Sequence, residues 1–293
     1  MTFRSGIVAV VGRPNVGKST LVNALVGHKV AIVSDKPQTT RRDIRGILTT
    51  ETYQVVFTDT PGFHKPRTLL GSRLNELVGD ATAGADAVVQ VVDARAGVGR
   101  GDAFVHERRV APSPCPRICA VNKIDLLRKR EEVPQLQAAA DLGAFDEVVP
   151  VSAATGRGVP LLLDVLVGLL PEGPPLYPPE EVSDQSLEVR LAETIREKAL
   201  AVTREEVPHS IAVIVEEVER EEGLMRIRGT IVVERDSQKG IVIGKGGSVL
   251  KAIGSRARAE LEGTLGTRVF LDLHVKVLKE WQRDPKALRR LGY

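Results

Sequence analysis

The sequence has few cysteines, few aromatic residues and no long apolar run. Its 293 residues hold two cysteines, Cys115 and Cys119, and only one Trp, three Tyr and six Phe. The cysteines lack His or Cys partners at zinc-site spacing, so we expect reduced thiols in a cytoplasmic protein. No apolar stretch reaches the ~20 residues that cross a bilayer. The N-terminal residues lack the apolar core of an export signal, so we expect a protein that is not exported.

Charge is distributed unevenly along the chain, although the net charge is only +3. Residues 1–186 hold 21 basic and 21 acidic side chains. Residues 205–234 have a net charge of −5, whereas residues 235–293 have 13 basic and 6 acidic side chains and a net charge of +7. The basic block indicates either a surface that faces a polyanion or an ordinary solvated surface.

Short Val- and Ile-rich runs alternate with helical patterns over the first 171 residues. Near-continuous apolar strands that alternate with helices predict a mostly parallel sheet covered on both faces. Ligands of such sheets bind beyond the carboxyl ends of the strands. The expected strands are Ile7–Val11, Ile44–Thr50, Tyr53–Asp59, Ala87–Val92, Arg117–Val121 and Glu147–Val151. The expected helices are Lys18–Val26, Leu70–Ala81, Asp102–Val110, Glu132–Leu142 and Val159–Leu170.

A proline-rich segment, Pro171–Pro179, marks a domain boundary. Prolines at this density cannot lie inside a helix or a central strand, so we interpret the segment as a semi-rigid spacer. The length of the chain also favours two domains. The predicted division is a first domain at 1–171, a linker at 172–186 and a second domain at 187–293.

Beyond the linker, the pattern changes to the order helix, strand, strand, helix, helix, strand. Two alternating runs flank Glu222-Gly223, which is typical of a hairpin turn, and a Gly-Lys-Gly-Gly break separates the later helices. This order predicts a second, α+β domain. The expected elements are Leu187–Val202, His209–Glu219, Leu224–Glu234, Gly240–Ile243, Ser248–Leu261 and Arg268–Leu278.

The segment Gly12–Ser19 has the spacing G-x-x-x-x-G-K-S between an apolar strand and a helix. In this context the pattern predicts a loop that binds nucleotide phosphates. Its glycines let backbone N–H groups approach phosphate oxygens, and the helix N-terminus favours their negative charge. We expect Lys18 to reach the β- and γ-phosphates and Ser19 to ligate Mg²⁺. The predicted residues of this loop are Gly12, Asn15, Val16, Gly17, Lys18, Ser19 and Thr20.

The segment Asp59-Thr60-Pro61-Gly62 ends the third expected strand. At that position Asp59 can hold Mg²⁺ through a water, and the Gly62 N–H can sense the γ-phosphate. A D-x-x-G pattern alone is also common in ordinary turns. The interpretation therefore depends on its distance from the phosphate loop and its place at the carboxyl end of a strand.

Asn122-Lys123-Ile124-Asp125 follows the fifth expected strand and predicts recognition of guanine. Asp125 can accept hydrogen bonds from N1–H and the 2-amino group, a donor pair that adenine lacks. A site built on such bonds discriminates by a factor of ~10⁴ or more. We expect Lys123 to lie over the base, Asn122 to hold the phosphate loop, and Ser152 and Ala153 to place an N–H near O6. Alone, N-K-x-D is also typical of a capped helix start.

Gln38-Thr39-Thr40-Arg41 lies in a polar stretch between the first helix and the second strand. A threonine there can complete the Mg²⁺ shell only when the γ-phosphate is present, so the loop would be ordered by GTP and loosened by GDP. We expect Thr40 to take this role, with Thr39 as the other candidate. Taken alone, the four residues are equally typical of a surface loop. The predicted metal site is Ser19, Thr40 and Asp59.

Phe63 follows Gly62, where Ras-like enzymes place a glutamine that orients the attacking water. Because Phe63 cannot do so, we expect slow hydrolysis that K⁺ or RNA stimulates. Asn15 can help to bind a K⁺ ion whose charge would replace that of an arginine finger. His64 is another candidate base, although a solvent-facing histidine of the loop is the plainer interpretation. The residues expected to act in catalysis are Asn15, Lys18, Thr40 and Gly62.

The Gly244–Gly247 loop lies between two expected helices, as in KH domains, where such a loop clamps about four single-stranded nucleotides. Lys245 supplies charge there, and we expect Trp281 to be a packing anchor rather than a platform for base stacking. Apolar residues on both sides can build a core and a groove: Ile241, Ile243, Val249, Leu250 and Ile253. The predicted RNA-binding residues are Lys239, Gly244, Lys245, Gly246, Gly247, Lys251, Arg283, Arg289 and Arg290.

Taken together, these motifs closely resemble those of the Era family of bacterial GTPases, over almost the whole chain. The segments are GRPNVGKST at 12–20, QTTR at 38–41, DTPGFHKP at 59–66, NKID at 122–125, VSA at 151–153, IGKGG at 243–247 and VKVLKEWQRDPKALRRLGY at 275–293. The resemblance implies a P-loop GTPase domain followed by a type II KH domain. It also implies binding of small-subunit ribosomal RNA near its 3′ end, a role in 30S subunit assembly, and loose association with the inner face of the cell membrane. We expect GTP or GDP and Mg²⁺ as ligands, and a monomer.

Three hypotheses about function remain at this point. In the first, the protein is an enzyme that acts as a timer, with RNA held or released as GTP is hydrolysed. In the second, it is a binding module that uses GTP mainly as a structural ligand. The third places it among GTPases of large-subunit assembly or tRNA modification, which usually carry a second G domain or other accessory domains that are absent here.

Overall fold

The computed structural model describes residues 2–203 and 207–293, which form two compact units. The first unit consists of Met1–Val33, Thr40–Arg67 and Gly71–Asp184, and the second of Ser34–Thr39, Thr68–Leu70 and Gln185–Tyr293. Each unit has its own sheet and its own hydrophobic core. The boundaries that the sequence suggests, after residue 171 and before residue 187, stay predictions.

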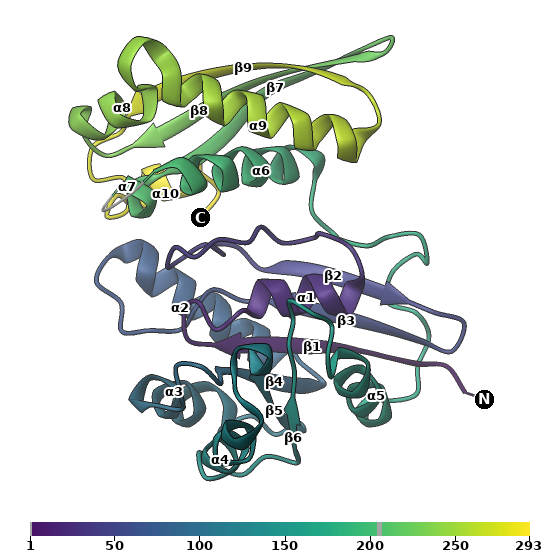
Figure 1. Cartoon of the computed structure of the whole chain (residues 1–293). Helices are drawn as coiled ribbons and strands as arrows, with labels where there is room; N and C mark the ends of the chain where they lie inside the picture. The colour runs from purple at the N-terminus through teal and green to yellow at the C-terminus, as the bar shows by residue number, and fades with distance from the viewer. Residues whose placement is uncertain (1, 204–206) are drawn as a thin grey trace. The chain divides into compact units, whose positions relative to one another are not determined.

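A six-stranded sheet with the order β2-β3-β1-β4-β5-β6 forms the centre of the first unit (Figure 1). Strand β2 is antiparallel to β3, and all other neighbours are parallel. The predicted, mostly parallel sheet is therefore confirmed. The strands are β1 Arg4–Gly12, β2 Ile44–Thr49, β3 Tyr53–Asp59, β4 Ala87–Asp93, β5 Arg117–Asn122 and β6 Glu147–Pro150.

Helices cover both faces of this sheet. Val8 and Val10 of β1 pack with residues of α1 and α5, whereas Ala9 and Val11 pack with residues of α2 and α3. Because successive side chains of a strand point to opposite faces, a strand covered on both sides is apolar at nearly every position. The helices are α1 Lys18–Val26, α2 Leu69–Ala83, α3 Arg100–Val105, η1 His106–Val110, η2 Ile124–Leu126, α4 Lys129–Ala140 and α5 Val159–Leu169.

The helix predicted at Asp102–Val110 consists of two parts. An α-helical turn, α3, continues into the π-helical segment η1, in which the Ala111 N–H donates to the carbonyl of His106 at 2.8 Å. Periodicity predicted one regular helix because a single π turn leaves no clear signal in an apolar pattern. Among the residues that the structure describes, no helix combines the length and the apolar character needed to cross a membrane.

The proline-rich segment is bound to the sheet of the first unit. Gln54 of β3 is fully buried, and its Oε1 accepts hydrogen bonds from the amides of Leu176 and Tyr177 at 2.7 and 2.9 Å. Further along, the Ile47 amide of the edge strand β2 donates to the carbonyl of Val182 at 2.9 Å. The segment interpreted as a spacer is thus held by hydrogen bonds over much of its length.

The second unit has a three-stranded sheet of order β7-β8-β9. Strands β7 and β8 are antiparallel, joined by a turn in which Gly223 has φ 69°, and β9 is parallel to β8. The predicted order of elements is confirmed, and the described residues add the short helices α7 and α10 and the 3₁₀ turn η3. The elements are α6 Leu187–Val202, α7 Val207–Ser210, β7 Ala212–Glu221, β8 Leu224–Val233, α8 Asp236–Ile243, η3 Lys245–Gly247, α9 Ser248–Leu265, β9 Arg268–Val277 and α10 Pro285–Arg290.

Trp281 is a core residue of the second unit. Its side chain is fully buried, its Nε1–H donates to the carbonyl of Ser210 at 3.0 Å, and its ring stacks on Tyr293 with centroids 5.8 Å apart. A fully buried ring has no free face for a nucleotide base. The expectation that Trp281 is a packing anchor is confirmed.

We predict that Trp281→Ala lowers the free energy of unfolding of the second unit by about 3–5 kcal/mol, because truncation leaves a cavity and an unpaired Ser210 carbonyl. Hydrogen exchange of the amides of β8 and β9 in the full chain measures this change. Phe270→Ala is the control, because Phe270 is 53 % exposed in the same unit. Its cost should stay below about 1 kcal/mol. Equal losses for the two variants would contradict the assignment of Trp281 to the core.

Candidate functional site

The phosphate loop lies between β1, which ends at Gly12, and α1, which begins at Lys18. Asn15 and Gly17 have φ values of 65° and 96°, so the chain curls there as a glycine-rich loop allows. A Cβ on Gly17 would lie 2.4 Å from Nδ2 of Asn122, which leaves room only for glycine. The loop therefore presents its backbone N–H groups beyond the carboxyl edge of the sheet.

Lys18 is buried inside this loop. Its Nζ donates to the carbonyls of Gly12 and Arg13 at 3.3 and 3.0 Å. Burial lowers the pKa of the amine to about 8, although the charge of Asp59 acts to raise it. A desolvated amine that is held only by carbonyl oxygens gains strongly when an anion arrives.

Ser19, Thr40 and Asp59 converge beside the phosphate loop. Ser19 Oγ donates to Asp59 Oδ2 at 2.6 Å, Thr40 Oγ1 donates to the same oxygen at 3.1 Å, and the two hydroxyl oxygens are 2.9 Å apart. The other carboxylate oxygen, Oδ1, is buried and makes no hydrogen bond within the described structure. Burial raises the pKa of Asp59, while Lys18 and the two hydroxyls act to lower it.

This donor set fits Mg²⁺. The ion prefers oxygen ligands and combines one or two carboxylates with waters and phosphate oxygens rather than an all-protein cage. The orphaned Oδ1 of Asp59 and the two hydroxyls supply such oxygens. Within the described part of the chain, no group of three or more His, Cys, Asp or Glu side chains forms a metal site. The Thr39 hydroxyl, by contrast, donates to the carbonyl of Lys36 at 2.6 Å.

The loop after Asp59 packs directly on the phosphate loop. The Phe63 amide donates to the carbonyl of Gly12 at 3.1 Å. A Cβ on Gly62 would lie 2.8 Å from atoms of Pro14, so only glycine allows this approach. The Phe63 ring is buried and stacks on Phe104, with centroids 5.2 Å apart. Phe63 therefore lies in the core, in keeping with the expectation that it does not orient a water.

The predicted base-recognition loops are joined by Asn122. Its Nδ2 donates to the carbonyl of Val16 at 2.9 Å, and its Oδ1 accepts from the amide of Ala153 at 3.0 Å. Lys123 donates to the carbonyl of Asn15 at 2.7 Å and to Asp93 at 2.6 Å. Asp125 is exposed at the same edge, and Ser152 is fully buried. Asn122 thus links the phosphate loop to the loop after β6, although the three segments are far apart in sequence.

The glycine loop of the second unit connects α8 to α9. Gly244, Gly246 and Gly247 all have positive φ values, of 74°, 59° and 78°. A Cβ on Gly244 would lie 2.5 Å from the Val249 side chain, whereas no atom of the described residues lies within 4 Å of a Cβ on Gly246 or Gly247. The outer half of the loop is therefore open to a ligand at the N-terminus of α9.

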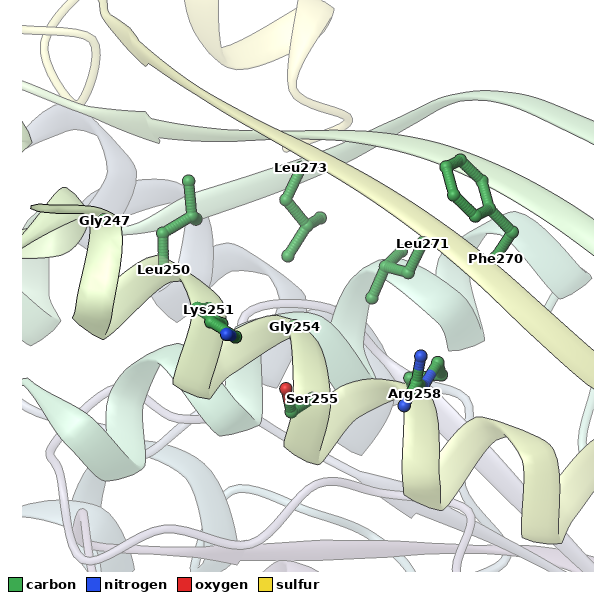
Figure 2. Close-up of a pocket in the computed structure, with 9 residues that line it drawn as sticks. All are labelled: Gly247, Leu250, Lys251, Gly254, Ser255, Arg258, Phe270, Leu271 and Leu273. Atoms are coloured by element: carbon green, nitrogen blue, oxygen red, sulfur yellow. The ribbon is translucent and has the colours of Figure 1, made fainter.

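A groove of about 390 Å³ begins at this loop and runs between α9 and β9 (Figure 2). Lys251, Ser255 and Arg258 lie along α9, and Leu271 and Leu273 of β9 lie opposite them. One wall is polar and basic and the other is apolar. This combination suits a phosphate backbone with bases turned inward.

Only part of the predicted RNA set lines this groove. Gly247 and Lys251 do, whereas Arg283, Arg289 and Arg290 are exposed elsewhere on the second unit. Ser255 and Arg258 were not predicted, although they continue from Lys251 at four- and three-residue steps along one helix face.

Among the apolar residues expected to build the core and the groove, Ile253 is buried. Ile241 is 51 % exposed, and its neighbour Val242 is buried instead.

The sequence also did not predict a contact between the phosphate loop and α3. Arg13 donates through Nε to Asp102 at 2.7 Å, and the Asp102 side chain is fully buried in α3. A Cβ on Gly101 would lie 2.5 Å from Cδ of Arg13, so the glycine makes room for this side chain. No motif links these distant residues, and only the packing of α3 beside β1 brings them together.

Two family models match the chain. The model described as "50S ribosome-binding GTPase" matches residues 7–123, and the model described as "KH domain" matches residues 206–282. The two matches fall on the phosphate loop with its neighbouring strands and on the glycine loop with its groove.

Curated proteins named GTPase Era are similar to the chain over its length. The identity is 52 % over 297 residues to the protein of Mycobacterium tuberculosis (strain ATCC 25618 / H37Rv) and 52 % over 296 residues to that of Mycolicibacterium paratuberculosis. Each alignment covers 99 % of this chain and 99 % of the relative.

Two solved structures are also similar, each covering 99 % of both chains at 39 % identity. One is Era in complex with MgGDPNP and nucleotides 1506–1542 of 16S ribosomal RNA, with a TM-score of 0.97. The other is a variant of Aquifex aeolicus Era bound to GDP·AlF₄⁻, with a TM-score of 0.96.

Proposed function

The chain belongs to the Era family of GTPases, and on that premise we propose that it hydrolyses GTP and binds small-subunit ribosomal RNA near its 3′ end during 30S subunit assembly. The observation that carries the proposal is the convergence of Ser19, Thr40 and Asp59 beside the phosphate loop. The open glycine loop and its groove supply a separate surface for RNA. Family membership also removes the hypothesis of a large-subunit or tRNA-modification GTPase.

The phosphate loop binds the triphosphate. Backbone N–H groups of residues 12–20 surround the phosphate oxygens, and the buried Lys18 amine reaches the β- and γ-phosphates. Ser19, Thr40 and Asp59 hold Mg²⁺, which when bound neutralises phosphate charge. Thr40 completes the Mg²⁺ shell, and the Gly62 amide bonds the γ-phosphate, only when GTP is bound. The loops that contain these two residues therefore distinguish GTP from GDP.

Asp125 selects guanine, and the contacts of Asn122 explain how the base and phosphate sites are kept in register. Asn122 bonds both Val16 of the phosphate loop and Ala153 of the loop after β6. Lys123 bonds the carbonyl of Asn15, which sets its stem beside the base position. The base therefore lies between Lys123 and the 152–153 backbone, with its 2-amino edge toward Asp125.

Hydrolysis is slow and depends on an added cation or on RNA. Phe63 is buried in the core, so no side chain at that position orients the attacking water. Asn15 lies exposed at the tip of the phosphate loop, where its side chain helps to bind K⁺ close to the transferred phosphate. The water oxygen attacks the γ-phosphorus, the bond to the β–γ bridging oxygen breaks, and GDP and phosphate leave.

The groove of the second unit binds single-stranded RNA. Phosphates lie over Gly246 and Gly247, and bases turn toward Leu271 and Leu273 while Lys251 supplies charge. In this proposal the protein acts as a timer: GTP orders the loops that contain Thr40 and Gly62, and RNA is held or released as hydrolysis proceeds. Membrane association, the monomeric state and the contribution of Arg283, Arg289, Arg290, Lys239 and Lys245 to RNA binding stay predictions.

We predict that Asp125→Asn weakens GTP binding at least about a hundredfold, because the amide cannot accept both guanine donors. The same variant should gain affinity for xanthosine triphosphate, whose 2-oxo group accepts a hydrogen bond from the amide. Titration calorimetry measures both affinities. Asp164→Asn, an exposed acid of α5, is the matched control and should bind as the wild type does. An unchanged preference for GTP in Asp125→Asn would remove Asp125 from the base site.

The K⁺ proposal predicts faster single-turnover hydrolysis in K⁺ than in Na⁺ at equal ionic strength. Asn15→Ala should lose this difference while it keeps GDP affinity, because the side chain and not the backbone of Asn15 meets the cation. Phosphate release after rapid mixing measures the rate. Equal rates of the wild type in both salts would exclude this role of Asn15.

For the RNA groove, we predict that Gly246→Asp lowers affinity for a single-stranded oligonucleotide from the 3′ end of small-subunit RNA by about tenfold or more, because a carboxylate would face phosphate. Fluorescence anisotropy at fixed salt measures the affinity. Gly263→Asp is the control, since it adds the same charge to the exposed side of α9. If both variants lost affinity equally, net charge rather than the glycine loop would explain the effect.

A further inference from the structure

We propose that Arg109 is a positioning residue for the loop that follows Asp59, and that it sets the preference of the nucleotide site for GTP over GDP. The inference rests on the proposed function, since it concerns how the Gly62 amide comes to meet the γ-phosphate. Arg109 lies in the π-helical segment η1, outside every motif of the nucleotide site. Single π turns of this kind are frequent at functional sites.

Arg109 contacts both the loop that follows Asp59 and helix α2. Its guanidinium carbon lies 4.7 Å from the centroid of the Phe63 ring, in a cation–π arrangement. Its Nη2 donates to the carbonyl of Asn75 on α2 at 3.0 Å. Gly79, one turn further along α2, makes room for it, because a Cβ there would lie 2.9 Å from Nη1.

Asn75 also contacts the loop that follows Asp59. Its Nδ2 donates to the carbonyl of His64 at 2.8 Å. Arg109 and Asn75 therefore hold two consecutive residues, the side chain of Phe63 and the main chain of His64. We call this pair the Arg109–Asn75 clamp.

The clamp is connected to Gly62 by one peptide unit. The Phe63 amide donates to the carbonyl of Gly12 at 3.1 Å, and Gly62 packs against Pro14 so closely that no Cβ fits. A displacement of Phe63 must move Gly62 relative to the phosphate loop. The clamp thus fixes where the Gly62 N–H points before a γ-phosphate arrives, which is preorganisation of a hydrogen-bond donor.

Two polar atoms of the clamp make no hydrogen bond within the described structure. Arg109 Nε and Asn75 Oδ1 are both buried and have no hydrogen-bond partner in the described structure. A buried donor and a buried acceptor that lack partners are unfavourable, so an arrangement that satisfies them is favoured when the loop can move.

GDP should be indifferent to the clamp. It lacks the γ-phosphate and binds through the phosphate loop and the base loops. Within the described part of the chain, Arg109 contacts Phe63, Asn75 and Gly79, which belong to none of those loops. A contact changes the ratio of two affinities only when it acts differently in the two bound states. Loss of Arg109 should therefore reduce the affinity for GTP more than the affinity for GDP. A general loss of stability would reduce both affinities.

The test uses the full chain with Mg²⁺ and compares affinities for GDP and for a non-hydrolysable GTP analogue by titration calorimetry. Arg109→Met keeps the length of the side chain and removes its charge and donors. Arg109→Lys keeps the charge without the planar fork, and Arg108→Met changes the exposed neighbour on η1 as a matched control. Asn75→Ala, which leaves Arg109 over Phe63, is the second route to a weakened clamp if Arg109→Met does not fold.

We expect Arg109→Met to lower affinity for the analogue relative to GDP about tenfold, or about 1.4 kcal/mol, with partial recovery in Arg109→Lys and no change in Arg108→Met. Asn75→Ala should shift the ratio in the same direction. An unchanged ratio, or equal losses for both nucleotides, would overturn the inference and leave the proposed function intact. A wild-type chain that bound neither nucleotide would remove the proposed function, and this inference with it.

Discussion

The buried carboxylate of Asp59 is the constraint on which the nucleotide site depends. It lies at the end of β3 with no exposed surface. One oxygen accepts from the hydroxyls of Ser19 and Thr40, and the other has no partner among the described residues. A buried charge must be compensated, and here the compensation comes from Ser19 of the phosphate loop and from Thr40 of the 38–41 loop. Any change in what Asp59 binds therefore alters the contacts of Ser19 and of Thr40 together.

The phosphate-binding loops of the two units are built in a similar way. In each, a helix begins directly after a glycine in the left-handed region, Gly17 before α1 and Gly247 before α9. The absence of a side chain lets the first N–H groups of the helix meet phosphate oxygens. The first unit closes its loop around a terminal triphosphate, whereas the open loop of the second admits a continuing backbone.

Local patterns predicted what depends on local chemistry. The sheet, the helix order of both units and the grouping of Ser19, Thr40 and Asp59 follow from strand ends and glycine positions that the sequence displays. The contacts of Arg13 with Asp102 and of Arg109 with Phe63 were not predictable, because each joins residues more than 40 positions apart and depends on how α3 and η1 pack. The π turn at His106–Val110 was not predicted for a different reason: it adds one residue to a single helical turn and leaves the composition unchanged.

The contacts of β2 with residues 182 and 183, which follow the proline-rich segment, have a consequence for association between molecules. An uncovered edge strand presents unpaired N–H and C=O groups on which a strand of another molecule can add. The Ile47 amide is already engaged by Val182, and Gly46 is bridged to Ser183. Because residues 182 and 183 occupy these positions of the edge, a strand of another molecule cannot add to β2 there.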